Sequence, residues 1–170
     1  MSTSFTANYR LVLQDNFQNL LDLSTVEDSL AQTIVKSLSD GEGQDKAQIH
    51  WHDERTLAES SNDDLDLAGG LETAFGVAQF TKIKALAVWL TTTTTGYKLA
   101  VGGAGSNPIT SLFTGSNDAI IVGNGGVLFL LAPGDGYTVT GGSADVLRIA
   151  NLSSGAVTYR VYIAGEGSIA

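Results

Sequence analysis

The sequence predicts a mainly β protein, an antiparallel jelly-roll-like β-sandwich with an N-terminal arm and possibly one helix. The 170-residue chain contains 20 glycines and only two prolines. Its Val, Ile and Thr residues cluster in short runs between Gly-rich segments, a composition typical of short strands joined by tight turns. Beyond residue 77, turn signals recur about every 8–12 residues, a spacing that favours a sandwich or jelly roll over a parallel α/β sheet.

Two segments differ in composition. Residues 1–72 contain 14 acidic and 4 basic residues, whereas residues 73–170 contain 4 acidic and 5 basic residues. Glycine is scarce before residue 69 and abundant after it. We therefore expect residues 1–40 to form an N-terminal arm or extension, with a strand and possibly a helix, and residues 41–170 to form the β-sandwich domain.

The predicted arm contains one clear strand and one ambiguous element. Tyr9, Leu11 and Leu13 alternate on one face, as in a half-buried strand, and are candidates for an interface. After them, 24-STVE-27 matches a capping box, and Val26, Leu30, Ile34 and Leu38 recur at fourfold spacing up to Gly41, which predicts a helix of about four turns. The β-branched residues around Ile34 and the even spacing also fit a strand, so both readings stay open.

Within the predicted domain, residues 81–92 are apolar on both faces over most of their length, which predicts a central strand. We expect Trp89, in this strand, to lie in the core. Residues 47–57 predict another strand, and Trp51 within it is a further interface candidate.

The composition argues against several classes of function. The absence of cysteine excludes disulfides and cysteine nucleophiles. A net charge of −9 argues against a nucleic-acid partner, which would need neutralising cations. The longest apolar stretches, 85–90 and 127–132, are too short to cross a bilayer, and the N-terminus lacks the apolar region of a signal peptide. These observations favour a soluble protein made in a cytoplasm, with no membrane partner.

His50, His52 and Glu54 are the best-formed candidates for chemistry. In a strand they would project from one face, and two imidazoles with a carboxylate suit zinc or non-haem iron. Cupin-type sites use a similar pair of histidines, but they need a third histidine and this chain has two. The alternative is a solvent-facing or subunit-facing polar strand edge. We therefore expect no metal and no cofactor, and hold these three residues only as weak metal candidates.

Other motifs predict turns or loops and no enzyme activity. The Gly-rich runs 102–105 and 123–126 precede no convincing helix, so a phosphate cradle is not predicted. The acidic residues 62–66 lack the glycine and glutamate of an EF-hand. No serine lies in a Gly-x-Ser-x-Gly elbow.

From about residue 41 to the end, the chain contains a series of structural turn and strand motifs. They are 64-DLDLAGGLETAFG-76, 80-FTKIKAL-86, 100-AVGGA-104, 125-GGV-127 leading to Pro133, 136-GYTVTGGSADVLRIAN-151 and 157-VTYRVYI-163. In this layout, which covers roughly three quarters of the chain, the sequence resembles a group of small tailed-bacteriophage virion proteins.

The resemblance implies a structural protein of the virion, a capsid cement or decoration protein on the capsid surface. Such a protein would bind the major capsid protein at capsomer junctions and associate with copies of itself as a dimer or trimer, after synthesis in the host cytoplasm. The alternative is a tail-associated module that binds a receptor or glycan.

Overall fold

The computed structural model describes residues 4–20 and 22–170. Within these ranges the regular structure consists of β-strands, with no helix, and the mainly β prediction is confirmed. Residues 1–3 and 21 of the predicted arm lie outside the described residues. The strands are β1 (Thr6–Leu20), β2 (Thr25–Asp40), β3 (Lys46–Ala47), β4 (Ile49–Leu57), β5 (Asn62–Asp66), β6 (Leu71–Thr73), β7 (Gly76–Leu90), β8 (Lys98–Gly102), β9 (Ala119–Gly123), β10 (Val127–Leu131), β11 (Tyr137–Thr138), β12 (Val146–Asn151) and β13 (Val157–Ile169).

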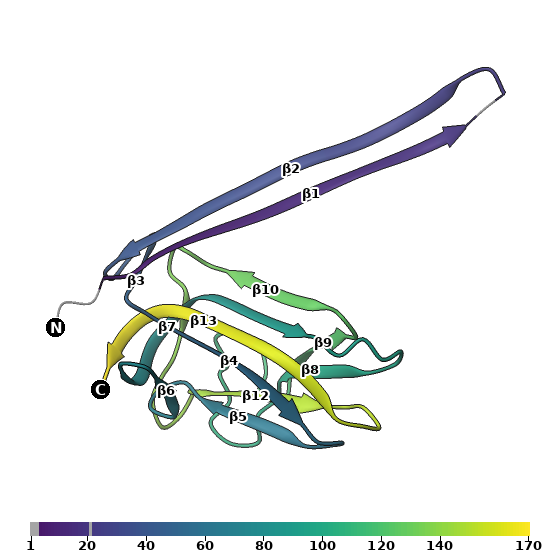
Figure 1. The fold of residues 1–170 in the computed structure, drawn as a ribbon. Coiled ribbons are helices and arrows are strands. Elements are labelled where there is room, and N and C mark those ends of the chain that lie inside the picture. Colours follow the sequence, from purple (N-terminus) through teal and green to yellow (C-terminus); the bar gives the residue numbers. More distant parts are fainter. Residues whose placement is uncertain (1–3, 21) are drawn as a thin grey trace.

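Two antiparallel sheets form the body of the protein (Figure 1). One has the strand order β10-β7-β13-β4, with β6 and β11 also paired to β7; the other has the order β5-β12-β8-β9. The long strand β7 lies between β10 and β13, as the apolar character of both its faces predicted. The C-terminal strand β13 pairs with β4 and β7, so it joins early and late parts of the chain in one sheet.

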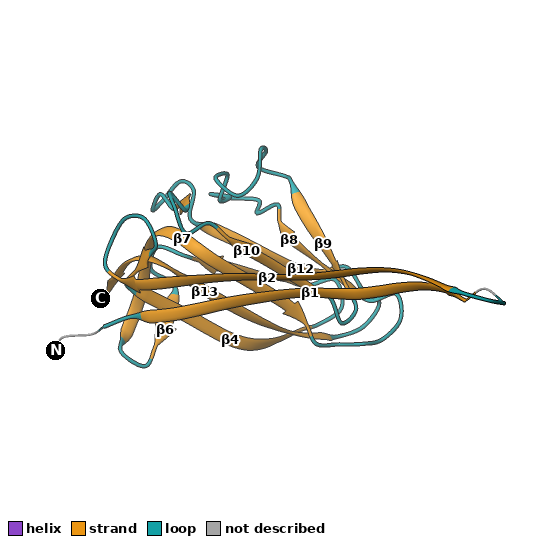
Figure 2. Ribbon diagram, turned by 90° about the horizontal axis from the view of Figure 1, so that it is seen from above, coloured by secondary structure: helices purple, strands orange, loops and turns teal. Residues whose placement is uncertain are grey.

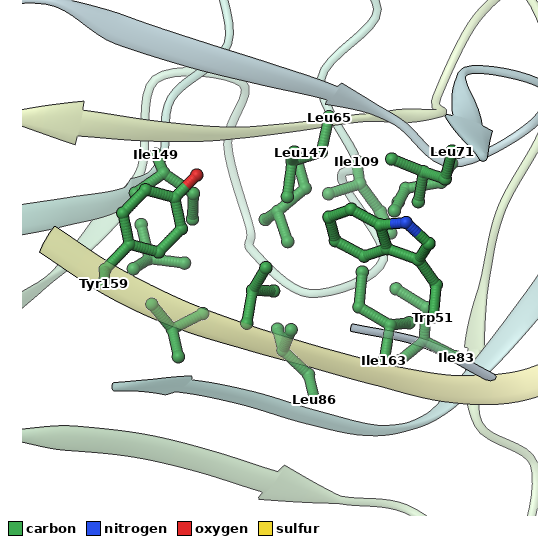
Figure 3. Packing of buried hydrophobic residues seen from close by; sticks show 14 of the residues in the cluster. Trp51, Leu65, Leu71, Ile83, Leu86, Ile109, Leu147, Ile149, Tyr159 and Ile163 are labelled. Carbon is green, nitrogen blue, oxygen red and sulfur yellow. The ribbon is translucent and has the colours of Figure 1, made fainter. Parts of the chain in front are cut away.

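The main core lies between these two sheets (Figure 3). The six-stranded sheet contributes inward-facing side chains such as Trp51, Leu86 and Tyr159, and the four-stranded sheet contributes Leu147 and Ile149. All five are at most 4% exposed. Alternation along each strand sends every second side chain into this layer, because successive residues of a strand point to opposite faces.

Of the two readings left open for the segment after residue 24, the strand is confirmed and the helix is wrong: the segment is strand β2, of which residues 25–39 pair antiparallel with β1. The reason is geometric. Residues four apart share one face of a helix, but an even spacing places them on one face of a strand as well. Val26, Leu30, Ile34 and Leu38 therefore line one side of β2, where β-branched residues such as Ile34 are favoured.

The β1–β2 hairpin leaves the body at an angle (Figure 1) and, seen from above, runs across the six-stranded sheet and past its end (Figure 2). Only its base is packed, in a small second cluster with Phe5, Leu38 and Ala47 against Ala85 and Ala164 of the six-stranded sheet. The short strand β3 pairs with the end of β2 in parallel and holds the hairpin beside the body. Within the described residues, no helix is long and apolar enough to span a membrane.

Candidate interaction surface

The β1–β2 hairpin is amphipathic. Residues paired across an antiparallel ladder project on the same side, so the register assigns each side chain to one of two faces. One face, hereafter the hairpin's apolar face, carries most of the large apolar side chains; the opposite face is mostly polar, with Val12, Leu20 and Val35 as exceptions. The apolar residues of this face are Tyr9, Leu11, Leu13 and Phe17 from β1 and Val26, Leu30, Ile34 and Leu38 from β2. Polar residues alternate with them on the same face, so that each cross-strand pair from Leu11 to the tip contains at least one large apolar side chain; these polar residues are Asp15, Asn19, Asp28, Gln32 and Lys36.

Most of this apolar face is in contact with solvent. Leu11 is 42% exposed, and Phe17, nearer the tip, is 75% exposed. Leu13, Val26, Leu30 and Ile34 are also exposed, whereas Leu38 at the base is buried. Isolated exposed apolar residues are common, but a continuous stripe along one element marks an interaction surface.

The six-stranded sheet presents a second partly apolar surface on the side away from the main core, hereafter the outer face. Its residues form three rows across β10, β7, β13 and β4, fixed by the strand register. The apolar side chains gather on β10 and β7, and the polar ones on β4. The rows are Leu131, Ala85, Ala164 and His50; then Phe129, Ala87, Tyr162 and His52; then Val127, Trp89, Arg160 and Glu54.

Tyr9 joins the hairpin's apolar face to the outer face. Its hydroxyl oxygen lies 3.0 Å from that of Tyr162, and its ring centroid lies 6.0 Å from that of Phe129. Burial, together with the hydrogen bond to Tyr162, raises the pKa of Tyr9 above its usual range. The phenol is therefore neutral at physiological pH and forms a hydrogen-bonding contact at the point where the hairpin meets the sheet.

A buried ion pair fixes the loop that follows the hairpin. The ammonium of Lys84, which is fully buried, lies 3.0 Å from a carboxylate oxygen of Glu166 and donates to the carbonyl oxygens of Gly43 and Gly134. Glu166 also accepts a hydrogen bond of 2.9 Å from the backbone N–H of Gly43. Burial opposes ionisation of Glu166, but the Gly43 N–H and the ammonium groups of Lys84 and Lys82 prevail and hold the pKa below its usual range.

The three weak metal candidates lie together on the outer face, as strand alternation predicted. The imidazoles of His50 and His52 stack with centroids 5.7 Å apart, and the carboxylate of Glu54 lies 2.5 Å from the Arg160 guanidinium. Burial and the neighbouring His52 lower the pKa of His50. Across residues 4–20 and 22–170, no group of three or more His, Asp or Glu side chains is placed to hold a metal ion.

Two hollows flank this row of residues. A shallow trough of about 320 Å³ is lined by His52, Glu54, Trp89, Arg160 and Tyr162, among others. The Arg160 guanidinium lies 5.6 Å from the centroid of the Trp89 ring, so a cation already covers part of that aromatic surface. A second groove of about 740 Å³ lies beside it; its lining includes Phe5 from the segment before β1, His50 and Trp51 from β4, and Phe75 from the turn before β7.

The positions of the two tryptophans are the reverse of those that the sequence suggested. Trp51, an interface candidate, is 4% exposed and donates its indole N–H to the carbonyl oxygen of Glu72 at 3.1 Å, so it has no surface for a partner. Trp89, expected in the core, is 44% exposed on the outer face. The expectation for Trp89 is wrong because a strand with apolar residues on both faces does not reveal which face meets the core.

Of the other interface candidates, Leu11 and Leu13 are exposed to solvent, whereas Tyr9 is partly buried against Tyr162 and Phe129. Tyr9, Leu11 and Leu13 share the hairpin's apolar face, as their alternation predicted. The sequence reasoning missed Phe17, Leu30 and Ile34 as members of the same surface. The signal that could have found them was the twofold spacing from Tyr9 to Phe17, continued on β2 if that segment is read as a strand.

Comparisons of this chain with protein-family models, with curated proteins and with solved structures find no match. What the fold establishes is the class: an all-β protein of antiparallel sheets with an exposed N-terminal hairpin.

Proposed function

We propose that this protein is a structural component of a bacteriophage virion, a capsid cement or decoration protein that binds the major capsid protein at capsomer junctions on the capsid surface. In this proposal the body is a jelly-roll-like β-sandwich and the hairpin is the arm that reaches across a subunit boundary. The protein associates as a dimer or trimer and acts by covering capsid surface, and not as an enzyme.

One observation carries the proposal: the hairpin's apolar face is continuous, solvent-exposed and borne on an element that extends past the body. A two-stranded hairpin is marginal in water by itself, so a long one with an apolar face gains stability when a partner covers that face. Where a neighbouring copy of the chain covers such a face, the linked copies bind a shell junction together and stabilise the shell by mass action. The resemblance of residues 41–170 to small phage virion proteins points to the same role.

The test measures the binding of this chain to purified phage heads that lack it. Unaltered chain is expected to add stoichiometrically and to raise the melting temperature of the shell. Phe17→Asp, on the apolar face, is expected to weaken this binding, whereas Gln18→Asp, on the adjacent polar-face position, leaves it unchanged. Cryo-electron microscopy of decorated heads would then show density at capsomer junctions; density confined to tails, or none, would refute the capsid role.

A tail-associated receptor- or glycan-binding module is the second candidate, and the trough at Trp89 and Tyr162 favours it. Aromatic rings beside polar groups such as His52 and Glu54 are typical of ligand pockets. The Arg160 guanidinium over Trp89 counts against it, because a sugar would have to displace that contact. Titration with glycans, followed by the fluorescence of Trp89 in a Trp51→Phe chain, would detect such binding; Trp89→Phe is the control.

A further inference from the structure

Each chain has two apolar surfaces that match one another and meet only at one end. The hairpin's apolar face contacts the outer face through Tyr9, at Phe129 and Tyr162. Beyond that point the hairpin leads away from its own sheet (Figure 1), and Phe17 and Trp89 are both left exposed. The contact at Tyr9 shows that the two surfaces pack against each other, and most of each surface is still uncovered.

We propose that the outer face around Trp89 and Arg160 receives the distal half of the β1–β2 hairpin from a second copy of this chain, in a reciprocal exchange. The hairpin of each copy then packs on the outer face of the other copy. Both copies use the same residues in the interface, as twofold symmetry requires. Trp, Tyr and Arg, which meet at this site, are the residue types that dominate binding energy at protein interfaces.

The surface area that would be buried favours the reciprocal arrangement over contact between two hairpins. From Leu11 to the tip, the apolar face is roughly 30 Å long and two strands wide, or about 300 Å². Two hairpins packed on each other would bury only about 600 Å² in total, which is less than a specific interface needs. Two hairpin-to-sheet contacts would bury about 1,200 Å², at the lower end of stable protein–protein interfaces.

Charge favours the same arrangement. Residues 11–35 contain four acidic residues and no lysine or arginine, so the distal hairpin is uniformly acidic. On the outer face, Arg160 lies beside Trp89 with 57% of its side chain accessible, and it is paired at 2.5 Å with the carboxylate of Glu54. The hairpin's own cations, Arg10 and Lys36, lie near its base. Asp15 and Asp28 project on the hairpin's apolar face, so a partner's hairpin would compete with Glu54 for Arg160, which fixes the register of the contact.

The isolated chain provides the test, so its outcome is independent of whether the protein binds phage heads. Sedimentation velocity over a range of concentrations is expected to show a dimer. Phe17→Asp on the hairpin and Trp89→Glu on the outer face should each weaken self-association at least about 10-fold. The controls are Gln18→Asp, on the polar face of the hairpin, and Ile121→Glu, an exposed apolar site on the four-stranded sheet. Circular dichroism and thermal melting establish that each variant is folded.

Mixing distinguishes hairpin exchange from other modes of association. A Phe17→Asp chain retains an intact outer face, and a Trp89→Glu chain retains an intact hairpin, so a mixture is expected to form heterodimers through one intact contact. This association should be tighter than that of either variant with itself and weaker than that of the unaltered chain, because only half of the interface is restored. If two hairpins packed on each other instead, Trp89→Glu would dimerise normally by itself, and the proposal would be overturned. A monomer for the unaltered chain at all concentrations would also overturn it.

Crosslinking distinguishes exchange from closure of the hairpin onto its own sheet. Because the chain has no cysteine, a Leu13→Cys, Val127→Cys double variant carries only the introduced pair. Oxidation at micromolar concentration is expected to give a covalent dimer, and Gln14→Cys in place of Leu13→Cys should give little. A disulfide formed within one chain would mean that the hairpin closes on its own body, and the exchange would be refuted.

Discussion

The hydroxyl groups of Tyr9 and Tyr162 lie 3.0 Å apart although 153 residues separate them in the chain. This contact is where the hairpin ceases to pack on the sheet and begins to project. It sets the direction of the hairpin's apolar face, because the Tyr9 ring also packs at 6.0 Å from Phe129. The orientation of the proposed interaction surface therefore depends on a few groups at the hairpin's base.

Tyr9→Phe is expected to loosen the hairpin without unfolding the body. The variant keeps the ring contacts but loses the hydroxyl pair, at a cost of about 1 kcal/mol. Hydrogen exchange should show lower protection of the β1 and β2 amides, with the core strand β7 unchanged. Arg10→Ala, at the next position on the opposite face, serves as control. Equal protection in Tyr9→Phe and the unaltered chain would show that the hydroxyl contact has no part in holding the hairpin.

Glu166→Gln is expected to destabilise the protein by about 3–5 kcal/mol at neutral pH, because it leaves the buried ammonium of Lys84 without its carboxylate. The pKa of Glu166 is lowered on folding, so its ionisation stabilises the folded state above the ordinary carboxyl pKa near 4.5. That contribution is lost as the pH falls through the folded pKa. Urea unfolding at several pH values should therefore show that the difference in the free energy of unfolding between the variant and the unaltered chain becomes smaller below pH 4.5.

Two further variants complete the test of this ion pair. Glu59→Gln, which removes an exposed carboxyl, should leave the free energy of unfolding at neutral pH unchanged. A Lys84→Met, Glu166→Gln double variant should be more stable than Glu166→Gln, because removing the buried charge as well removes its desolvation cost. A double variant no more stable than the single one would show that Lys84 is needed for its contacts to Gly43 and Gly134 and not only for charge.

Replacing Trp51 should destabilise the protein much more than replacing Trp89, and the two rings should differ in their accessibility to a quencher. Trp51→Ala is expected to cost about 3–5 kcal/mol, because it empties a large volume in the core. Trp89→Ala should cost about 1 kcal/mol or less in a monomeric background, since its ring faces solvent. In chains made monomeric by Phe17→Asp, iodide should quench the fluorescence of Trp89 strongly and that of Trp51 weakly. Comparable quenching of both would contradict the assigned burial.

Gly165→Ala is expected to destabilise the protein by about 3 kcal/mol or more, because a Cβ at this position would collide with the carbonyl oxygen of Lys82. Gly165 lies at a shift in the register between β13 and β7, where the two backbones approach closely. Gly123→Ala is the matched control, because its Cβ would meet no atom within 4 Å. Thermal melting should separate the two variants by several degrees; equal melting temperatures would show that β13 shifts to accept the methyl group.

Composition and local periodicity were sufficient to predict the class of fold and the central position of β7. Gly-rich turns between β-branched runs favour strands, and residues 81–92, apolar on both faces, favour a strand in the interior of a sheet. Local periodicity also placed Tyr9, Leu11 and Leu13 on one face, and His50, His52 and Glu54 on one face, because alternation along a strand is a local property of the backbone.

Three features follow from long-range contacts and could not be predicted from local patterns: the second half of the hairpin, the positions of the two tryptophans, and the buried pair of Lys84 and Glu166. An even spacing of apolar residues is compatible with helix and strand alike, and pairing with β1 decides between them. Whether Trp51 or Trp89 faces the core depends on which side of the six-stranded sheet the four-stranded sheet covers. That choice, like the meeting of Lys84 with Glu166, is made by contacts between residues far apart in the chain, which no local pattern encodes.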